Sequence, residues 1–224
     1  MLLIVPGVLK PDELALAREW LSGVRFVDGK ASAGAAARRV KQNLEAERGA
    51  GALERLDEMV MGNLSRHPVY RGGALPLHAA TPLYIRYAPG MRYGEHLDDA
   101  IMGAGGVLYR SDVAVTVFLS APEAYDGGEL VIRGAAGEQS VKLPAGDAVL
   151  YPAGTIHRVN PVTRGERLVA VTWVQSVVRD PAKRELLYGL NLAREKLLST
   201  APEAEETAQV NAAYSNLMRM WSDL

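Results

Sequence analysis

The middle of this chain, residues 82–176, consists of short β-rich runs separated by turns that contain Gly, Pro or Asp. Regularly spaced short strands of this kind are typical of a β-sandwich or β-barrel. The expected strands cover 83–87, 112–119, 129–132, 140–143, 148–151 and 167–175. No other feature limits the fold as strongly.

Helical patterns flank this β-rich region on both sides. A helix is expected from Pro11 to about Gly23, because proline and two carboxylates occupy its first turn. A short strand is expected at 24–27, followed by a mainly helical stretch at 35–64 that glycines interrupt near residue 50. The first third is therefore expected to be mostly helical. Helical patterning returns after residue 180 and, after a break at 200–203, continues to Trp221.

The length and composition suit one globular domain. The chain has 224 residues, of which 48% are hydrophobic and 23% charged, and it shows no internal repeat or long linker. We expect residues 81–177 to form the core, residues 1–80 to buttress it, and residues 178–224 to form a helical extension.

Composition excludes several kinds of partner and site. The formal net charge of −1 provides no overall field that would attract nucleic acid or an anionic membrane. Cysteine is absent, so any metal must be bound by His, Asp, Glu or Tyr. The apolar run that opens the sequence is too short for a signal peptide or a membrane span, which favours a cytoplasmic protein.

A His-x-Asp pair, His96 and Asp98, is the first candidate for a metal site. Alternate residues at a strand end project to the same side, so both side chains could bind one ion. Such a pair is common by chance. The alternative is a turn in which Asp98 or Asp99 caps the backbone.

A second histidine, His157, follows a hydrophobic strand and a Pro/Gly turn. In a jelly-roll barrel, strands that are distant in sequence become neighbours, so His157 could join His96 and Asp98. Two histidines and one carboxylate on one face of an ion form the triad that suits non-heme Fe(II) and leaves positions open.

Arg167 lies ten residues after His157 and opens a long apolar run. A planar guanidinium binds a carboxylate through two hydrogen bonds, so Arg167 could anchor a dicarboxylate that also chelates the iron. The alternative is a surface arginine after a turn. The order His-x-Asp, distant His, then Arg is more specific than any one element.

Motifs along nearly the whole chain resemble those of the bacterial PKHD-type hydroxylases, in the prolyl-4-hydroxylase-like branch of the Fe(II)/2-oxoglutarate dioxygenases. The motifs are FVDGKASAG at 26–34, VKQN at 40–43, YGEHLD at 93–98, YDGGEL at 125–130, LYP at 150–152, HRVNPVTRG at 157–165, WVQS at 173–176 and NLMRMW at 216–221.

This resemblance implies an α+β fold in which helices buttress a double-stranded β-helix, a jelly-roll or cupin-like barrel. It also implies that His96, Asp98 and His157 bind Fe(II) and that Arg167 anchors 2-oxoglutarate. The implied reaction converts 2-oxoglutarate and O₂ to succinate and CO₂ and hydroxylates a peptidyl or amino-acid-like substrate. L-ascorbate would keep the iron reduced.

The sequence differs from the family pattern at three positions that flank the site. Ile85, Asp99 and Met102 stand where Asn, Asn and Arg are usual, so the substrate pocket is expected to differ. We expect substrate recognition to lie in the helical first third, which contains Lys41 and Asn43, and in the loop at 99–110, which contains Asp99 and Met102. The alternative for Lys41 and Asn43 is the solvated face of a helix.

Other residues have both a structural and a functional interpretation. Tyr84, Tyr87 and Tyr93 either contact 2-oxoglutarate or only pack in the barrel. Gly127 and Gly128 are expected to form a tight hairpin turn, not a phosphate-binding loop. The other two histidines, His67 and His78, are expected to lie outside the site.

A different class of protein is also consistent with the barrel, namely a cupin-like module that binds a metal and a small acid without turnover. The sequence identifies neither the primary substrate nor the oligomeric state. The closing helix, which contains Leu217, Met218 and Trp221, could cover its own barrel or that of a second copy in a homodimer.

Overall fold

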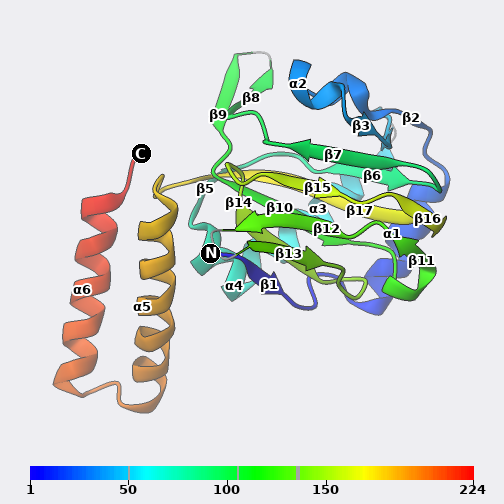
Figure 1. Cartoon of the computed structure of the whole chain (residues 1–224). Coiled ribbons are helices and arrows are strands. Elements are labelled where there is room, and N and C mark those ends of the chain that lie inside the picture. The colour runs from blue at the N-terminus through cyan, green and yellow to red at the C-terminus, as the bar shows by residue number, and fades with distance from the viewer. Residues whose placement is uncertain (50, 105, 135–136) are drawn as a thin grey trace.

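The computed structural model describes residues 1–49, 51–104, 106–134 and 137–224, and in these ranges it is built mainly from short strands (Figure 1). The strands are β1 (Leu3–Val5), β2 (Phe26–Asp28), β3 (Lys41–Gln42), β4 (Leu44–Ala46), β5 (Pro76–Ala79), β6 (Leu83–Tyr87), β7 (Arg92–His96), β8 (Ile101–Ala104), β9 (Val107–Arg110), β10 (Val113–Phe118), β11 (Tyr125–Gly127), β12 (Leu130–Gly134), β13 (Gly137–Val141), β14 (Ala148–Pro152), β15 (His157–Val159), β16 (Val162–Gly165) and β17 (Arg167–Ser176). The helices are α1 (Pro11–Ser22), α2 (Ala35–Arg38), α3 (Gly51–Arg66), α4 (Pro68–Ala74), α5 (Pro181–Thr200) and α6 (Glu205–Trp221), with 3₁₀ turns at Gly29–Ser32 and Pro122–Ala124.

Two antiparallel sheets carry the fold. Within the described ranges, the larger has eight strands in the order β1-β14-β10-β17-β6-β4-β2, with β5 also paired to β17. The smaller has five strands in the order β13-β12-β15-β7-β3. The pairs β8-β9 and β11-β16 form separate two-stranded sheets. Most neighbouring strands are distant from each other in the sequence. The observed fold therefore depends on long-range pairing, and it combines helices with antiparallel sheets.

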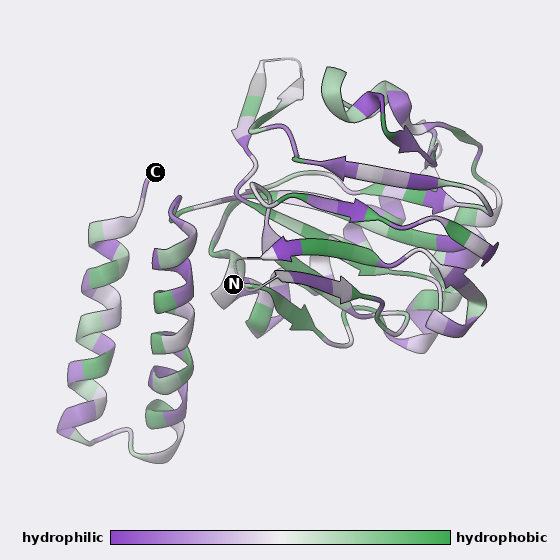
Figure 2. Ribbon diagram, in the orientation of Figure 1, coloured by the Kyte–Doolittle hydropathy of each residue, from purple (hydrophilic) through white to green (hydrophobic). Residues whose placement is uncertain are grey.

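Strand β10 shows how the larger sheet separates two cores. Val113, Val115 and Val117 face the buried side chains of α1 and α3, whereas Ala114 and Phe118 face the smaller sheet. Side chains alternate between the two faces of a strand, and burial on both faces explains why this run is apolar except for Thr116. Green predominates along the central strands in Figure 2, as this packing requires.

The predicted strands at 83–87, 112–119, 148–151 and 167–175 match β6, β10, β14 and β17 to within one residue at each end. The expected helix at the start is also confirmed, since α1 spans Pro11–Ser22 and Gly23 caps its C-terminus. Its first turn is closed by Glu13, whose carboxylate accepts the Lys10 backbone N–H at 2.8 Å. Here local sequence signals were sufficient.

The helical prediction for 35–64 was wrong over its first half. Only α2 is helical there, after which β3 pairs with β7 and β4 pairs with β6. Lys41 and Asn43 are therefore not on a solvated helix face, since both are buried between sheet strands. Ala, Arg, Lys and Glu favour helix locally, but pairing with strands distant in sequence overrides this preference.

The C-terminal helices pack against each other beside the sheets. Figure 1 shows α5 and α6 as an antiparallel pair that extends away from the strands. Tyr214, Leu217, Met218 and Trp221 pack on a small core formed by Leu75, Val178 and Leu187. Thus α6 covers α5 rather than the sheets. None of the described helices is long and apolar enough to cross a membrane.

Candidate functional site

A cavity of about 560 Å³ opens between the two sheets. Its walls come from β6, β7, β10, β15 and β17, from segment 32–41, and from the strands of the β8–β9 hairpin. Six of the candidate residues identified from the sequence line it, namely Tyr87, Tyr93, His96, Asp98, His157 and Arg167. Residues from distant parts of the chain therefore meet in one place.

His96, Asp98 and His157 form a compact group of potential metal ligands. His96 ends β7, His157 begins β15, and the two are direct partners in the pairing of these strands. One ligand atom from each of the three residues lies within 4.8 Å of the others, and His157 Nε2 is 3.8 Å from Asp98 Oδ1. These three ligands can bind one face of a divalent cation and leave the opposite face of the cation open to other ligands.

Backbone hydrogen bonds fix how the two imidazoles are presented. His96 Nδ1 lies 2.8 Å from the Gly94 carbonyl oxygen, and His157 Nδ1 lies 2.8 Å from that of Thr155. A carbonyl can only accept, so each Nδ1 carries the proton and each Nε2 presents a lone pair. Metal-binding histidines are commonly oriented in this way.

The surroundings of the group disfavour its charged forms when no cation is bound. Burial, together with the nearby His157, lowers the pKa of His96 from 6.5 to about 3. Burial raises the pKa of Asp98, whose Oδ2 has no hydrogen-bond partner among the described residues. A divalent cation would compensate both effects because it is attracted to the carboxylate and requires neutral imidazoles.

The pH dependence of stability tests the electrostatics of His96 directly. Its pKa is lower in the folded chain than in the unfolded chain, so the folded chain binds fewer protons between pH 6.5 and pH 3, and stability falls as the pH falls through this window. Between pH 7 and pH 5 the loss from this residue should be up to about 2 kcal/mol. We expect urea unfolding of chelator-treated protein to show a smaller loss in His96→Gln. An equal loss in both proteins would contradict this.

Arg167 begins β17 and is only 2% exposed. Its guanidinium carbon lies 5.1 Å from the Tyr87 ring centroid and 5.5 Å from that of Phe118. The ion pairs among the described residues do not include Arg167, and its Nε has no hydrogen-bond partner there. A buried cation without a carboxylate is costly, so the cavity is suited to an anion at this point.

Tyr87 lies beside Arg167, and Tyr93 lies beside His96 of the triad. The Tyr87 hydroxyl accepts the Asn43 side-chain N–H at 3.0 Å, which leaves its own proton free to donate. Burial raises the pKa of Tyr87, so this proton is retained. Tyr93 stacks on His96 with ring centroids 3.5 Å apart. Tyr84 points into the other core and donates to Asp57, so it does not line the cavity.

Several cavity residues were not predicted from the sequence. Thr116, Tyr151 and Trp173 line the cavity, and the pKa of Tyr151 is raised by burial and by Asp98. Strand alternation could have identified Trp173, because it shares a face of β17 with Arg167. The role of Asn43 could not be identified in this way because the segment was assigned to a helix.

The remaining sequence predictions have clear outcomes. Ile85, Asp99 and Met102 do line the cavity, and neither His67 nor His78 does. Gly127 and Gly128 both have positive φ, and a Cβ at Gly127 would lie 2.1 Å from the Pro161 oxygen. These glycines therefore allow the chain to approach the segment before β16 closely. The expected hairpin turn is wrong, because β11 pairs with β16 and not with β12. The predicted recognition loop at 99–110 contains the β8–β9 hairpin, and its residue 105 lies outside the described residues.

Comparison with known proteins identifies relatives over the whole chain. Residues 82–175 match the 2OG-Fe(II) oxygenase superfamily, and residues 181–223 match the PKHD-type hydroxylase C-terminal domain. A PKHD-type hydroxylase of Thioalkalivibrio sulfidiphilus is 49% identical and one of Hyphomonas neptunium is 47% identical, each over 100% of both chains.

The fold is similar to that of solved oxygenases. A prolyl hydroxylase from Trichoplax adhaerens, in complex with a peptide fragment of hypoxia inducible factor, superposes with a TM-score of 0.58 at 18% identity, over 83% of this chain and 86% of that one. The relatives support turnover rather than a cupin-like module that only binds. The chain belongs to the PKHD-type hydroxylases of the 2OG-Fe(II) oxygenase superfamily, and it is an Fe(II)- and 2-oxoglutarate-dependent dioxygenase.

Proposed function

We propose that His96, Asp98 and His157 hold the iron of this dioxygenase and that Arg167 holds the far carboxylate of 2-oxoglutarate. The observation that carries the proposal is the guanidinium of Arg167, buried in the cavity of the triad without a carboxylate partner among the described residues. The far carboxylate of a bound dicarboxylate would supply the missing partner.

Iron bound there, with 2-oxoglutarate and O₂, supplies oxidative decarboxylation to succinate and CO₂ coupled to hydroxylation of a substrate C–H bond. The side chains bind and orient. Arg167 would donate two parallel N–H hydrogen bonds to the far carboxylate of 2-oxoglutarate, and the Tyr87 hydroxyl would donate a third to the same carboxylate. Tyr93 keeps the His96 ring in place by stacking. The Phe118 ring lies 5.5 Å from the Arg167 guanidinium carbon and would shield that side of the guanidinium from water.

The arrangement of the sheets supports a double-stranded β-helix as the finer description of the fold. Strands β14, β10, β17 and β6 of one sheet face β12, β15 and β7 of the other across a common core. Taken in chain order, the strands β6, β7, β10, β12, β14, β15 and β17 lie alternately in the larger and the smaller sheet, as in jelly rolls. On this basis we assign the cavity to the interior of the barrel.

The primary substrate is proposed to be peptidyl or amino-acid-like. The supporting observation is that the relative from Trichoplax adhaerens holds a peptide fragment. In this chain, Ile85, Asp99 and Met102 line the cavity. These residues replace two amides and a guanidinium of the family pattern by one apolar side chain, one carboxylate and one thioether, so the chemistry of the accepted side chain is expected to differ.

Succinate formation tests the proposed reaction. Purified protein loaded with Fe(II) under air should convert 2-oxoglutarate to succinate slowly without primary substrate, and faster when an extract supplies it. A gain of one oxygen in a peptide or metabolite would identify the substrate. Absence of succinate from iron-loaded, folded protein would contradict the function.

Asn43 should influence the co-substrate, not only the substrate as the sequence suggested. Asn43→Ala removes a buried hydrogen bond to Tyr87 worth about 1 kcal/mol, so apparent affinity for 2-oxoglutarate should fall roughly two- to tenfold. Gln42→Ala, in the exposed neighbour, is the control. Equal KM values for 2-oxoglutarate in the two variants would show that Asn43 does not act through Tyr87.

A further inference from the structure

The β8–β9 hairpin forms one wall of the cavity, and its described side chains are exposed or half-buried. Near its base, Tyr109 packs against His78 of β5 with ring centroids 5.0 Å apart. Its residues Ile101, Met102 and Tyr109 line the cavity, and its strands pair only with each other in the described sheets. Ile101 is 58% exposed and Leu108 is 67% exposed. The position of this wall must therefore be set at its base, where Arg110 ends β9.

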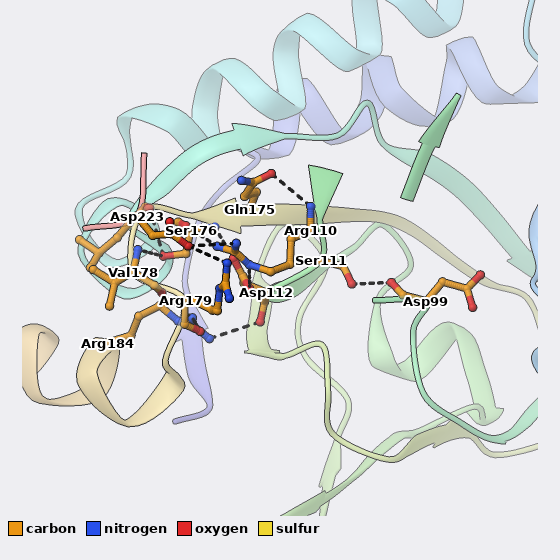
Figure 3. Close-up of polar contacts among 11 residues, drawn as sticks. Asp99, Arg110, Ser111, Asp112, Gln175, Ser176, Val178, Arg179, Arg184 and Asp223 are labelled. Atoms are coloured by element: carbon orange, nitrogen blue, oxygen red, sulfur yellow. Dashed lines mark hydrogen bonds and ion pairs between the residues drawn. The ribbon is translucent and has the colours of Figure 1, made fainter. Parts of the chain in front are cut away.

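Arg110 forms hydrogen bonds with Asp112 and with two residues at the end of β17. Its Nε donates to Asp112 Oδ1 at 2.7 Å and its Nη2 to the Ser176 carbonyl oxygen at 3.3 Å. Its backbone N–H donates to the side-chain oxygen of Gln175 at 3.1 Å. Gln175 and Ser176 belong to the WVQS motif, and unlike Trp173 of the same motif neither lines the cavity. Figure 3 shows these side chains gathered around Arg110.

The other partner of Arg110 comes from the end of the chain. Asp223, just after α6, pairs with Arg110 Nη1 at 3.4 Å and with Arg179 Nη2 at 2.8 Å. Its backbone N–H donates to the Val177 carbonyl oxygen at 2.7 Å. The residues just before α5 and just after α6 therefore meet at Asp223, and Arg110 connects them to the hairpin. The bonded group of Arg110, Asp112, Gln175, Ser176 and Asp223 is called the junction below.

Asp112 makes this junction rigid. Its side chain is 6% exposed, and its second oxygen accepts the Ser176 backbone N–H at 2.9 Å. Its carbonyl oxygen accepts from Arg184 of α5 at 3.3 Å, and the buried Arg184 also donates to the carbonyl oxygens of Val178 and Arg179, each at 2.7 Å. Buried charge networks that are fully bonded hold a defined geometry.

The same junction reaches the segment beside the metal group. The Ser111 hydroxyl donates to the Asp99 carbonyl oxygen at 2.5 Å, and its backbone N–H donates to that of Ala100 at 3.0 Å. Asp99 lines the cavity and follows Asp98 directly. Both the hairpin wall and the chain next to the triad are thus tied to one set of bonds.

We propose that Arg110 is a positioning residue for substrate recognition, through which the C-terminal helical pair α5–α6 sets the place of the cavity wall formed by Ile101, Met102 and Tyr109. This rests on the proposed function, because it takes the cavity to be where the primary substrate binds. It gives the C-terminal domain of this family member a part in the active site, although the domain supplies no residue to the cavity.

Hydrogen–deuterium exchange of the zinc-loaded full chain tests the link. In Arg110→Met, amides of β8 and β9 should exchange roughly tenfold faster, and in Asp223→Asn a few times faster, since the Asp223 pair is half exposed and partly screened. Amides of β6 should not change. Arg110→Lys should restore part of the protection. Glu206→Gln, an exposed carboxylate on α6, is the control and should behave like wild type.

A spectroscopic readout separates positioning from loss of stability. Met102 lines the cavity, so its ¹³C-labelled methyl group in Co(II)-loaded protein should show a shift that depends on its position relative to the metal. This shift should change in Asp223→Asn, whereas that of Met91 in the barrel core should not.

Three results would overturn the proposal: unchanged exchange of β8 and β9 in both variants, an equal rise in β6, or an unmoved Met102 shift. If Arg110→Met does not fold, Asp223→Asn decides alone. Succinate formation by the wild type is measured separately, so failure of the proposed function and failure of this link are distinguishable.

Discussion

His157→Ala is expected to lower the affinity for Fe(II) at least about a hundredfold and to abolish measurable succinate formation. The loss is large because each ligand supplies one of only three protein bonds, and even changes behind the ligands typically cost 10- to 100-fold. His157 also sets the register with His96 on the neighbouring strand. Anaerobic calorimetry with Fe(II), or with Mn(II) as a stable substitute, measures the affinity, and succinate assays measure turnover.

The matched control is His67→Asn. His67 lies outside the cavity, and its side chain caps α4 by accepting the Val69 backbone N–H, a role that asparagine can keep. Metal affinity and succinate formation should match wild type in this variant. Full metal occupancy in His157→Ala would remove His157 from the proposed ligand set and direct attention to other cavity donors.

The central strands could be predicted from the sequence because buried strands have a recognisable local composition of apolar residues. β10 is buried on both faces and β17 is rich in β-branched residues, so both are mostly apolar, with Thr116 as the one polar residue of β10. Turn residues marked their ends. The order of the two histidines, the aspartate and Arg167 then pointed to one site, and the structure places all four around one cavity.

Segment 35–46 could not be predicted in the same way. Its Ala, Arg, Lys and Glu residues favour helix locally, yet β3 and β4 pair with β7 and β6, about 40 to 50 residues further along the chain. The charge of the buried Lys41 is neutralised by Glu45 at 2.5 Å, and its ammonium group also donates to the Ser32 hydroxyl at 2.8 Å. No local pattern reveals these contacts. Charged residues were therefore assigned to a solvated surface.

The junction at Arg110 could not be predicted from the sequence, also because it depends on contacts between distant residues. Arg110 and Asp223 are 113 residues apart, and the intervening chain crosses both sheets and both C-terminal helices. A Gln-Ser pair at the end of a strand carries no functional signal by itself. Such sites depend on tertiary packing, and only the assembled fold shows which polar residues share one buried position.

Arg167→Met is expected to have opposite effects on co-substrate binding and on stability. Loss of charge-assisted hydrogen bonds to a buried carboxylate, worth about 1.5–3 kcal/mol, should weaken apparent affinity for 2-oxoglutarate by roughly tenfold to more than a hundredfold. Arg167→Lys should also be weaker than wild type, because an ammonium group cannot make the two parallel bonds. The KM for 2-oxoglutarate and calorimetry on Mn(II)-loaded protein measure these effects, while Mn(II) affinity itself should stay near wild type.

Without 2-oxoglutarate, the same Arg167→Met variant should be more stable than wild type by an amount of order 1 kcal/mol, because it removes a buried cation that lacks a carboxylate partner among the described residues. Adding 2-oxoglutarate with metal should raise the unfolding temperature of wild type and leave that of Arg167→Met nearly unchanged, since a ligand stabilises only the state that binds it. Arg164→Met is the control, because Arg164 is exposed and paired with Asp126 on the surface. An unchanged KM together with lowered stability in Arg167→Met would mean that Arg167 is a packing residue and that another cation anchors the co-substrate.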